Sequence, residues 1–210
     1  MADETTTHPA ELVVYLGSAM VLAFGGLAVA LSWDGMSAPV QVLVLAAAAA
    51  VLAVASYVTP GRSVAAGRIG DVTGTAAAIV LGWAAGLGSH HLGLSDELAI
   101  SIGAFVGAGG SVVAYLRRNG VVPMAVAGSG ALTGVIAALA DLSVTTEVIL
   151  LAGSVVGLGW WALGAAGTVR PPRAVMLAGG IHLFVLGVAF LDLASPWAPA
   201  ATAVTVSAYA

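Results

Sequence analysis

One serine and one histidine are the residues of this chain whose types could perform chemistry together. Ser129 lies in the small-residue stretch 127–134, and His182 lies in the apolar stretch 179–184. A serine hydroxyl becomes a nucleophile when a base lies within hydrogen-bond reach. A hydrolytic pair is therefore one hypothesis. The alternatives for His182 are a structural hydrogen bond to a serine or threonine, a haem ligand, and a proton relay.

The sequence around Ser129, Ala127-Gly128-Ser129-Gly130, resembles the Gly-x-Ser-Gly element of rhomboid intramembrane proteases, with alanine in place of the first glycine. In that family the serine on one helix is activated by a histidine two spans later. His182 likewise lies two apolar runs after Ser129. The resemblance implies an intramembrane serine hydrolase in which Ser129 is the nucleophile and His182 is the base.

Two adjacent histidines, His90 and His91, end another apolar run, and Asp96 and Glu97 follow the next turn. Histidine ligands on a helix are usually three or four residues apart. Adjacent residues point about 100° apart, so His90 and His91 are poorly placed to share one ion. We predict neither a metal site nor a cofactor. If a metal binds, one of these histidines with a neighbouring carboxylate is the candidate site.

The composition excludes several classes of protein. Of 210 residues, 60% are hydrophobic and 8% are charged, whereas a soluble domain carries roughly a quarter charged residues. All of the basic residues are arginine, so no lysine can form a retinal Schiff base. Cysteine is absent, which removes disulfides and thiolate sites. The arginines are spread over separate turns, and no basic patch suits nucleic acid.

Long apolar runs divide the chain. About 20 such residues cross the roughly 30 Å hydrocarbon core of a bilayer. The runs are 12–33, 40–58, 72–91, 98–116, 121–139, 148–169 and 174–193. The apolar end, 200–210, rises only about 16 Å as a helix. We predict an all-α polytopic transmembrane bundle of seven spans plus a partial or truncated eighth. Residues 1–10 form a polar tail, and 11–210 form one integral membrane domain.

The basic residues lie on one side of the bilayer if every run spans once. They follow the second, fourth and sixth runs, as Arg62, Arg68, Arg117, Arg118, Arg170 and Arg173. Short loops rich in arginine face the cytoplasm. The sequence therefore predicts a multi-pass plasma-membrane protein with a cytoplasmic N-terminus.

A weak internal repeat has a period of roughly fifty residues. Residues 94–100 can be laid over 142–149, and each stretch leads to a helix of small residues and then a basic turn. This pattern predicts antiparallel helical hairpins. The alternative interpretation is that any chain of spans joined by short loops shows a similar rhythm.

On four of the runs, glycines spaced four residues apart place two residues without side chains on the same helix face. Such faces let membrane helices pack closely. They could serve packing within the chain, a pore, or an interface with another membrane protein or a second copy. The pairs are Gly82 with Gly86, Gly103 with Gly107, Gly130 with Gly134, and Gly153 with Gly157.

No carboxylate or arginine lies in the middle of a predicted span, which argues against a proton-coupled carrier. Our interpretation is a permeation or carrier protein for a small solute or ion, without a clear catalytic signature. The alternatives are a non-catalytic subunit or scaffold of a membrane complex, and a hydrolase that uses Ser129 and His182. The residues expected along a solute path are Ser101, Ser111, Ser129, Thr133 and His182.

Overall fold

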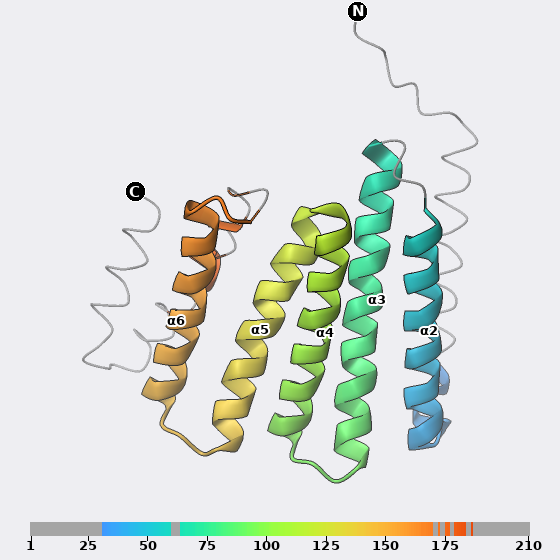
Figure 1. Ribbon diagram of the computed structural model, residues 1–210. Helices are drawn as coiled ribbons and strands as arrows, with labels where there is room; N and C mark the ends of the chain where they lie inside the picture. The colour runs from blue at the N-terminus through green and yellow to red at the C-terminus, as the bar shows by residue number, and fades with distance from the viewer. Residues whose placement is uncertain are drawn as a thin grey trace, which may run out of the picture. The chain divides into compact units, whose positions relative to one another are not determined.

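The computed structural model describes residues 31–59, 64–169, 172, 175–176, 179–183 and 186. Figure 1 shows a short 3-10 turn followed by long helices. The elements are η1 (Trp33–Gly35), α2 (Ala38–Val58), α3 (Val64–His91), α4 (Asp96–Arg118), α5 (Val121–Asp141) and α6 (Thr146–Ala165). The chain divides into two compact units, Met1–Gln41 and Val42–Ala210.

Five helices of the described part are long and apolar enough to cross a membrane. They correspond to the second through sixth predicted runs, so the prediction of an all-helical architecture with helices that could span a membrane is confirmed for these five. The first run, most of 174–193 and the end 200–210 lie outside the described residues. The total of seven spans and a partial eighth therefore stays a prediction, as does the single membrane domain.

Helix α3 is longer than the sequence indicated. The predicted apolar run starts at residue 72, but the helix already begins at Val64. Arg68 and Asp71 suggest a loop by their polarity, yet the stretch contains no proline that would prevent a helix. The hydroxyl of Thr75 donates to the Asp71 carbonyl oxygen at 2.7 Å, within the same helix.

Both ends of α4 are capped as its sequence suggests. The Ser95 hydroxyl accepts a hydrogen bond from the Leu98 N–H at 3.2 Å, and acidic residues occupy the first turn. At the other end Asn119 adopts a left-handed conformation, with φ 54°, and its N–H donates to the Tyr115 carbonyl oxygen. Negative charge at the start and arginine at the end both complement the helix dipole.

The turns after α3 and α5 share one geometry. The residue that leaves the helix is left-handed in both, Gly93 with φ 88° and Ser143 with φ 53°. The next N–H, of Leu94 or Val144, donates to the carbonyl five residues earlier, at 3.2 and 3.4 Å. This is the Schellman arrangement of a helix end. The two turns repeat at the predicted period, while duplication of a hairpin stays a prediction.

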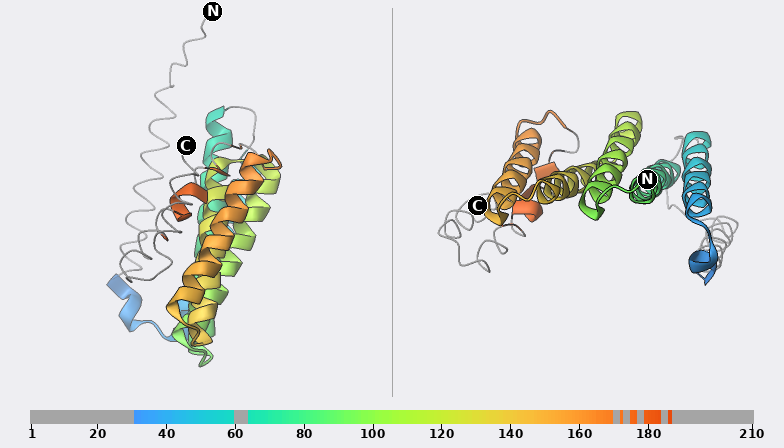
Figure 2. Two further views of the ribbon diagram at one scale, coloured as in Figure 1. Left: turned by 90° about the vertical axis from the view of Figure 1, so that its left-hand side faces the viewer. Right: turned by 90° about the horizontal axis from the view of Figure 1, so that it is seen from below.

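Helices α3 to α6 follow one another side by side, each packed against the next in sequence and antiparallel to it (Figure 1). Seen along the helix axes they stand in a row (Figure 2). The connections are only a few residues long, which restricts consecutive helices to antiparallel neighbours.

Helices α3 and α4 touch through their backbones. A Cβ atom added at Gly82 would lie 2.5 Å from the Gly103 carbonyl oxygen, and one at Gly103 would lie 2.7 Å from the Gly82 oxygen. On α5, a Cβ at Gly130 would lie 3.0 Å from the Ala104 oxygen of α4. These glycine faces therefore pack within the chain. An interface with a partner protein stays a prediction.

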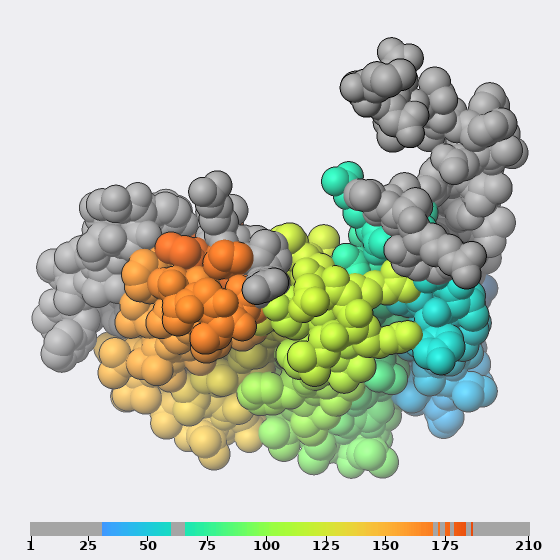
Figure 3. Space-filling view, turned by 45° about the horizontal axis from the view of Figure 1, so that its top comes forward, coloured from blue at the N-terminus to red at the C-terminus, as the bar shows by residue number. Residues whose placement is uncertain are grey.

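Arg118 joins the ends of three helices. Its Nη2 donates to the carbonyl oxygens of Ser56 and Thr59, at 2.6 and 3.0 Å, and its Nη1 donates to that of Gly67 at 3.4 Å. Ser56 belongs to the last turn of α2 and Thr59 follows its end, so no helical N–H remains to bond these carbonyls. Figure 3 shows the end of α4 in yellow-green beside the end of α2 in cyan. The arginines of α3 and α4 consequently lie at one end of these helices.

The α3–α4 contact gives a first prediction. Gly82→Ala should lower the free energy of unfolding by about 1–3 kcal/mol, because the added methyl group overlaps a backbone oxygen. Gly109→Ala is the matched control, since nothing lies within 4 Å of its Cβ position. The control should gain up to about 1 kcal/mol from helix propensity. Thermal unfolding in detergent measures both variants, and equal stability of the two would contradict the proposed backbone contact.

Candidate functional site

A groove of about 790 Å³ lies between α3, α4 and α5. We call it the α3–α5 groove. Its walls are largely apolar and include the exposed side chains of Trp83 and Ile100. Ser129 and Thr133 of α5 contribute two hydroxyl groups. Glycines line the surface where α3 and α4 touch, and they have no side chains to fill the space there. The larger side chains beside them therefore form the walls of the groove.

The predicted pair is formed. Ser129 Oγ lies 3.1 Å from His182 Nε2, within the range of a hydrogen bond. Ser129 is exposed to the groove that it lines, and His182 is half-buried. Which of the two atoms donates depends on the histidine tautomer. Together they offer a hydroxyl with an imidazole nitrogen beside it, next to an open cavity.

Trp160 of α6 lies against the residue that precedes Ser129. A Cβ atom added at Gly128 would lie 2.8 Å from the indole Nε1, so only glycine leaves room for the ring. This Nε1 is buried and has no hydrogen-bond partner among the described residues. Sequence reasoning did not assign Trp160 to the site. A tryptophan within an apolar run could have indicated a polar site, because a buried indole N–H usually needs a hydrogen-bond partner.

The other residues expected along a solute path lie in different surroundings. Thr133 lines the groove and is exposed. Ser101 is buried, and its hydroxyl donates to the Gly134 carbonyl oxygen at 2.9 Å. Ser111 is fully buried and its hydroxyl has no partner within the described part of the chain. The lining of the groove includes neither Ser101 nor Ser111. The structure therefore brings together three of the five candidates.

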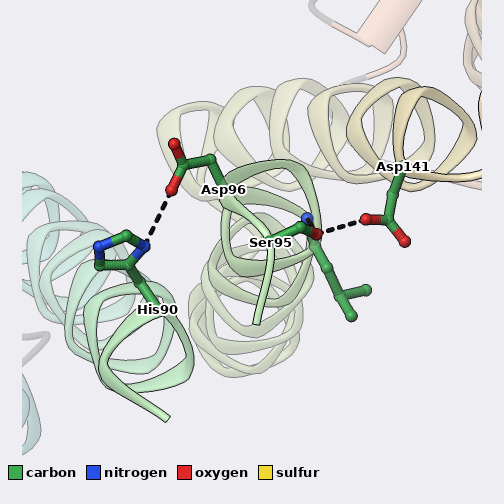
Figure 4. Close-up of polar contacts among 5 residues, drawn as sticks. His90, Ser95, Asp96 and Asp141 are labelled. Carbon is green, nitrogen blue, oxygen red and sulfur yellow. Dashed lines mark hydrogen bonds and ion pairs between the residues drawn. The ribbon is translucent and has the colours of Figure 1, made fainter. Parts of the chain in front are cut away.

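Polar contacts join the helix ends at one end of the groove (Figure 4). His90 Nδ1 lies 2.8 Å from Asp96 Oδ1, and both residues also line the groove. The Ser95 hydroxyl donates to the Asp141 carboxylate. His91 is exposed. In the described ranges, no three His, Cys, Asp or Glu residues are grouped so that they could hold a metal ion.

No family model matches the chain, and neither the search of curated proteins nor that of solved structures gave a match. The groove and the Ser129–His182 contact are therefore the features of the molecule that indicate a function.

The contact gives a second prediction. In a double-mutant cycle, Ser129→Ala and His182→Ala should show a coupling energy of about 0.6 kcal/mol, and at most about 1.7, as for other hydrogen bonds between membrane helices. Unfolding of the four proteins in detergent measures it. The cycle of Ser154→Ala with His182→Ala is the control, because in the part of the chain that the structure describes the Ser154 hydroxyl donates to the Leu150 oxygen of its own helix and not to His182. Strictly additive effects of Ser129→Ala and His182→Ala would show that the two side chains do not interact.

Proposed function

We propose that the protein binds a small, neutral, amphipathic solute in the α3–α5 groove and carries it through the membrane. The observation that supports this proposal is the groove itself. Its volume of about 790 Å³ lies within the usual range of small-molecule sites, about 300–1,000 Å³. Such sites are mainly apolar and contain a few polar groups that orient the ligand. Ser129 and Thr133 are the corresponding groups here.

A neutral solute fits the groove better than an ion. Within the lining that the structure describes, the ionisable residues are His90 and Asp96. They lie at the helix ends and contact one another at 2.8 Å. Ion-coupled carriers usually keep ionisable groups deeper in the membrane. A solute with a hydroxyl or carbonyl group could instead bond the α5 hydroxyls and leave its apolar part on Trp83 and Ile100.

The orientation is part of the proposal. Arg117, Arg118 and Arg68 lie at one end of α3 and α4, while Asp96 and Asp141 lie at the other. The positive-inside rule supports a cytoplasmic arginine end. We accordingly propose a plasma-membrane protein whose N-terminus faces the cytoplasm.

Proteoliposomes test the carrier function. Stopped-flow light scattering with glycerol, urea and 1,2-butanediol should show protein-dependent permeation, strongest for the amphipathic butanediol. Thr133→Phe fills the groove and should reduce the rate at least tenfold, while Thr133→Val keeps the volume and should have a smaller effect. Leu151→Phe is the control, since this exposed α6 residue lies outside the groove. Rates equal to those of empty liposomes for all three solutes would exclude these substrates, and an unchanged Thr133→Phe rate would exclude the groove.

The Ser129–His182 distance of 3.1 Å favours a second candidate function, an intramembrane serine hydrolase. In it His182 would take the hydroxyl proton as Ser129 Oγ attacks the carbonyl carbon of an ester or amide, and would pass that proton to the departing alcohol or amine. Water would then release the acyl group from Ser129. The exposure of Ser129 to the groove supports access for an amphipathic ester or amide.

A fluorophosphonate probe separates this candidate from the carrier. A hydrolase should be labelled at Ser129, and His182→Ala should slow labelling by about 10²-fold or more, the usual contribution of a general base. Ser154→Ala should label like the unmodified protein, because this serine bonds to the Leu150 oxygen within its own helix. Absence of labelling, or labelling that persists in Ser129→Ala, would reject the hydrolase and leave the pair as a ligand-binding or structural contact.

A further inference from the structure

A second groove lies between α2, α3 and α4, within the unit Val42–Ala210. We call it the alanine groove. Its volume is about 360 Å³, and half of its fourteen lining residues are alanines, six of them on α2 and α3. On α2 the lining extends from Ala46 to Ser56. This is about 15 Å of helix, half of the roughly 30 Å hydrocarbon core.

A positive charge stands at one end of the alanine groove, where Arg117 and Arg118 complete its lining. Arg118 already donates to three carbonyl oxygens of α2 and α3. Arg117 is exposed, and its guanidinium lies 4.6 Å from the centre of the Tyr57 ring. Within the described ranges no carboxylate forms an ion pair with Arg117. Its N–H donors therefore remain available to an external anion.

Tyr57 indicates the depth of this end in the membrane. Its ring is 71% exposed, and tyrosine gathers at the interface where lipid headgroups lie. The arginine that stacks on it consequently lies at the same depth. Arginine binds phosphate well because its planar group carries several N–H donors.

We propose that the alanine groove binds one acyl chain of an anionic phospholipid, whose phosphate group pairs with Arg117. The groove is about as long as one leaflet is thick, is mainly apolar and ends at a cation with no carboxylate partner among the described residues, which together match such a lipid. Basic pockets between membrane helices at the cytoplasmic side bind anionic headgroups in this way. The lipid would fill the space beside α2 and stabilise its position against α3 and α4.

Native mass spectrometry of the detergent-solubilised protein tests the proposal. Titration with dioleoyl-phosphatidylglycerol should give adducts about fivefold more readily than titration with dioleoyl-phosphatidylcholine, the factor expected for one arginine near the lipid. Arg117→Gln should remove this preference. Arg68→Gln is the charge-matched control, because Arg68 is exposed and is not part of the groove lining. Equal losses in both variants would indicate unspecific charge attraction and overturn the proposal.

A second pair of variants tests the acyl chain. Ala50→Phe fills the groove without changing the charge and should weaken phosphatidylglycerol binding at least threefold. Leu43→Phe, at an exposed position outside the groove, should leave binding unchanged. Glycerol phosphate, which has no acyl chain, should not bind. Binding of glycerol phosphate as tight as that of the lipid, or an unaffected Ala50→Phe variant, would overturn the acyl-chain assignment. Thermal unfolding verifies that each variant is folded.

Discussion

The backbone contact between α3 and α4 is the constraint on which the rest of the described structure depends. In a bilayer, apolar side chains gain nothing by leaving lipid, so helices associate through dispersion and weak backbone contacts that act only at short range. Gly82 and Gly103 allow this distance because neither carries a side chain. Gly130 extends the same packing from α4 to α5. The α3–α5 groove follows from this geometry. Glycines line its base, where the helices touch, and the larger side chains of Trp83 and Ile100 project beside them.

The ends of the helices are organised by a different requirement, the bonding of polar backbone groups. The carbonyls of Ser56 and Thr59, at the end of α2 and just after it, have no helical donors, and Arg118 of α4 donates to both. Its neighbour Arg117 points elsewhere and stacks on Tyr57, because successive residues on a helix are turned by about 100°. Two adjacent arginines thus have separate roles. One stabilises the arrangement of three helices, and the other presents a charge to the headgroup region.

The candidate site combines one polar contact with an apolar cavity. A hydroxyl in apolar surroundings needs a hydrogen-bond partner, and His182 supplies one to Ser129 across two segments of the chain. The same contact suits binding of a carbonyl or hydroxyl group and activation of a nucleophile. The indole N–H of Trp160, beside Gly128, adds a buried donor without a partner in the described part. The chemistry depends on whether a ligand reaches these groups through the groove.

The sequence by itself determined the described helices and most of their ends, because both are local properties. Span length follows from the number of consecutive apolar residues, and features such as the Ser95 cap and Asn119 lie next to the turns that they terminate. It also indicated the glycine faces and the pairing of Ser129 with His182, the latter through a resemblance in residue spacing. The early start of α3 was missed because Arg68 and Asp71 interrupt the apolar run, although the stretch contains no proline that would prevent a helix.

Only the tertiary structure decided which side of each helix faces which neighbour. The sequence placed Ser101, Ser111 and Ser129 equally on a solute path, yet the first two are buried and only Ser129 faces the groove. The three carbonyl partners of Arg118 and the position of Trp160 were likewise not predictable. A helix that is apolar all round carries no amphipathic stripe to define its rotation. That rotation is set instead by the packing of small residues on neighbouring helices, which are distant in sequence.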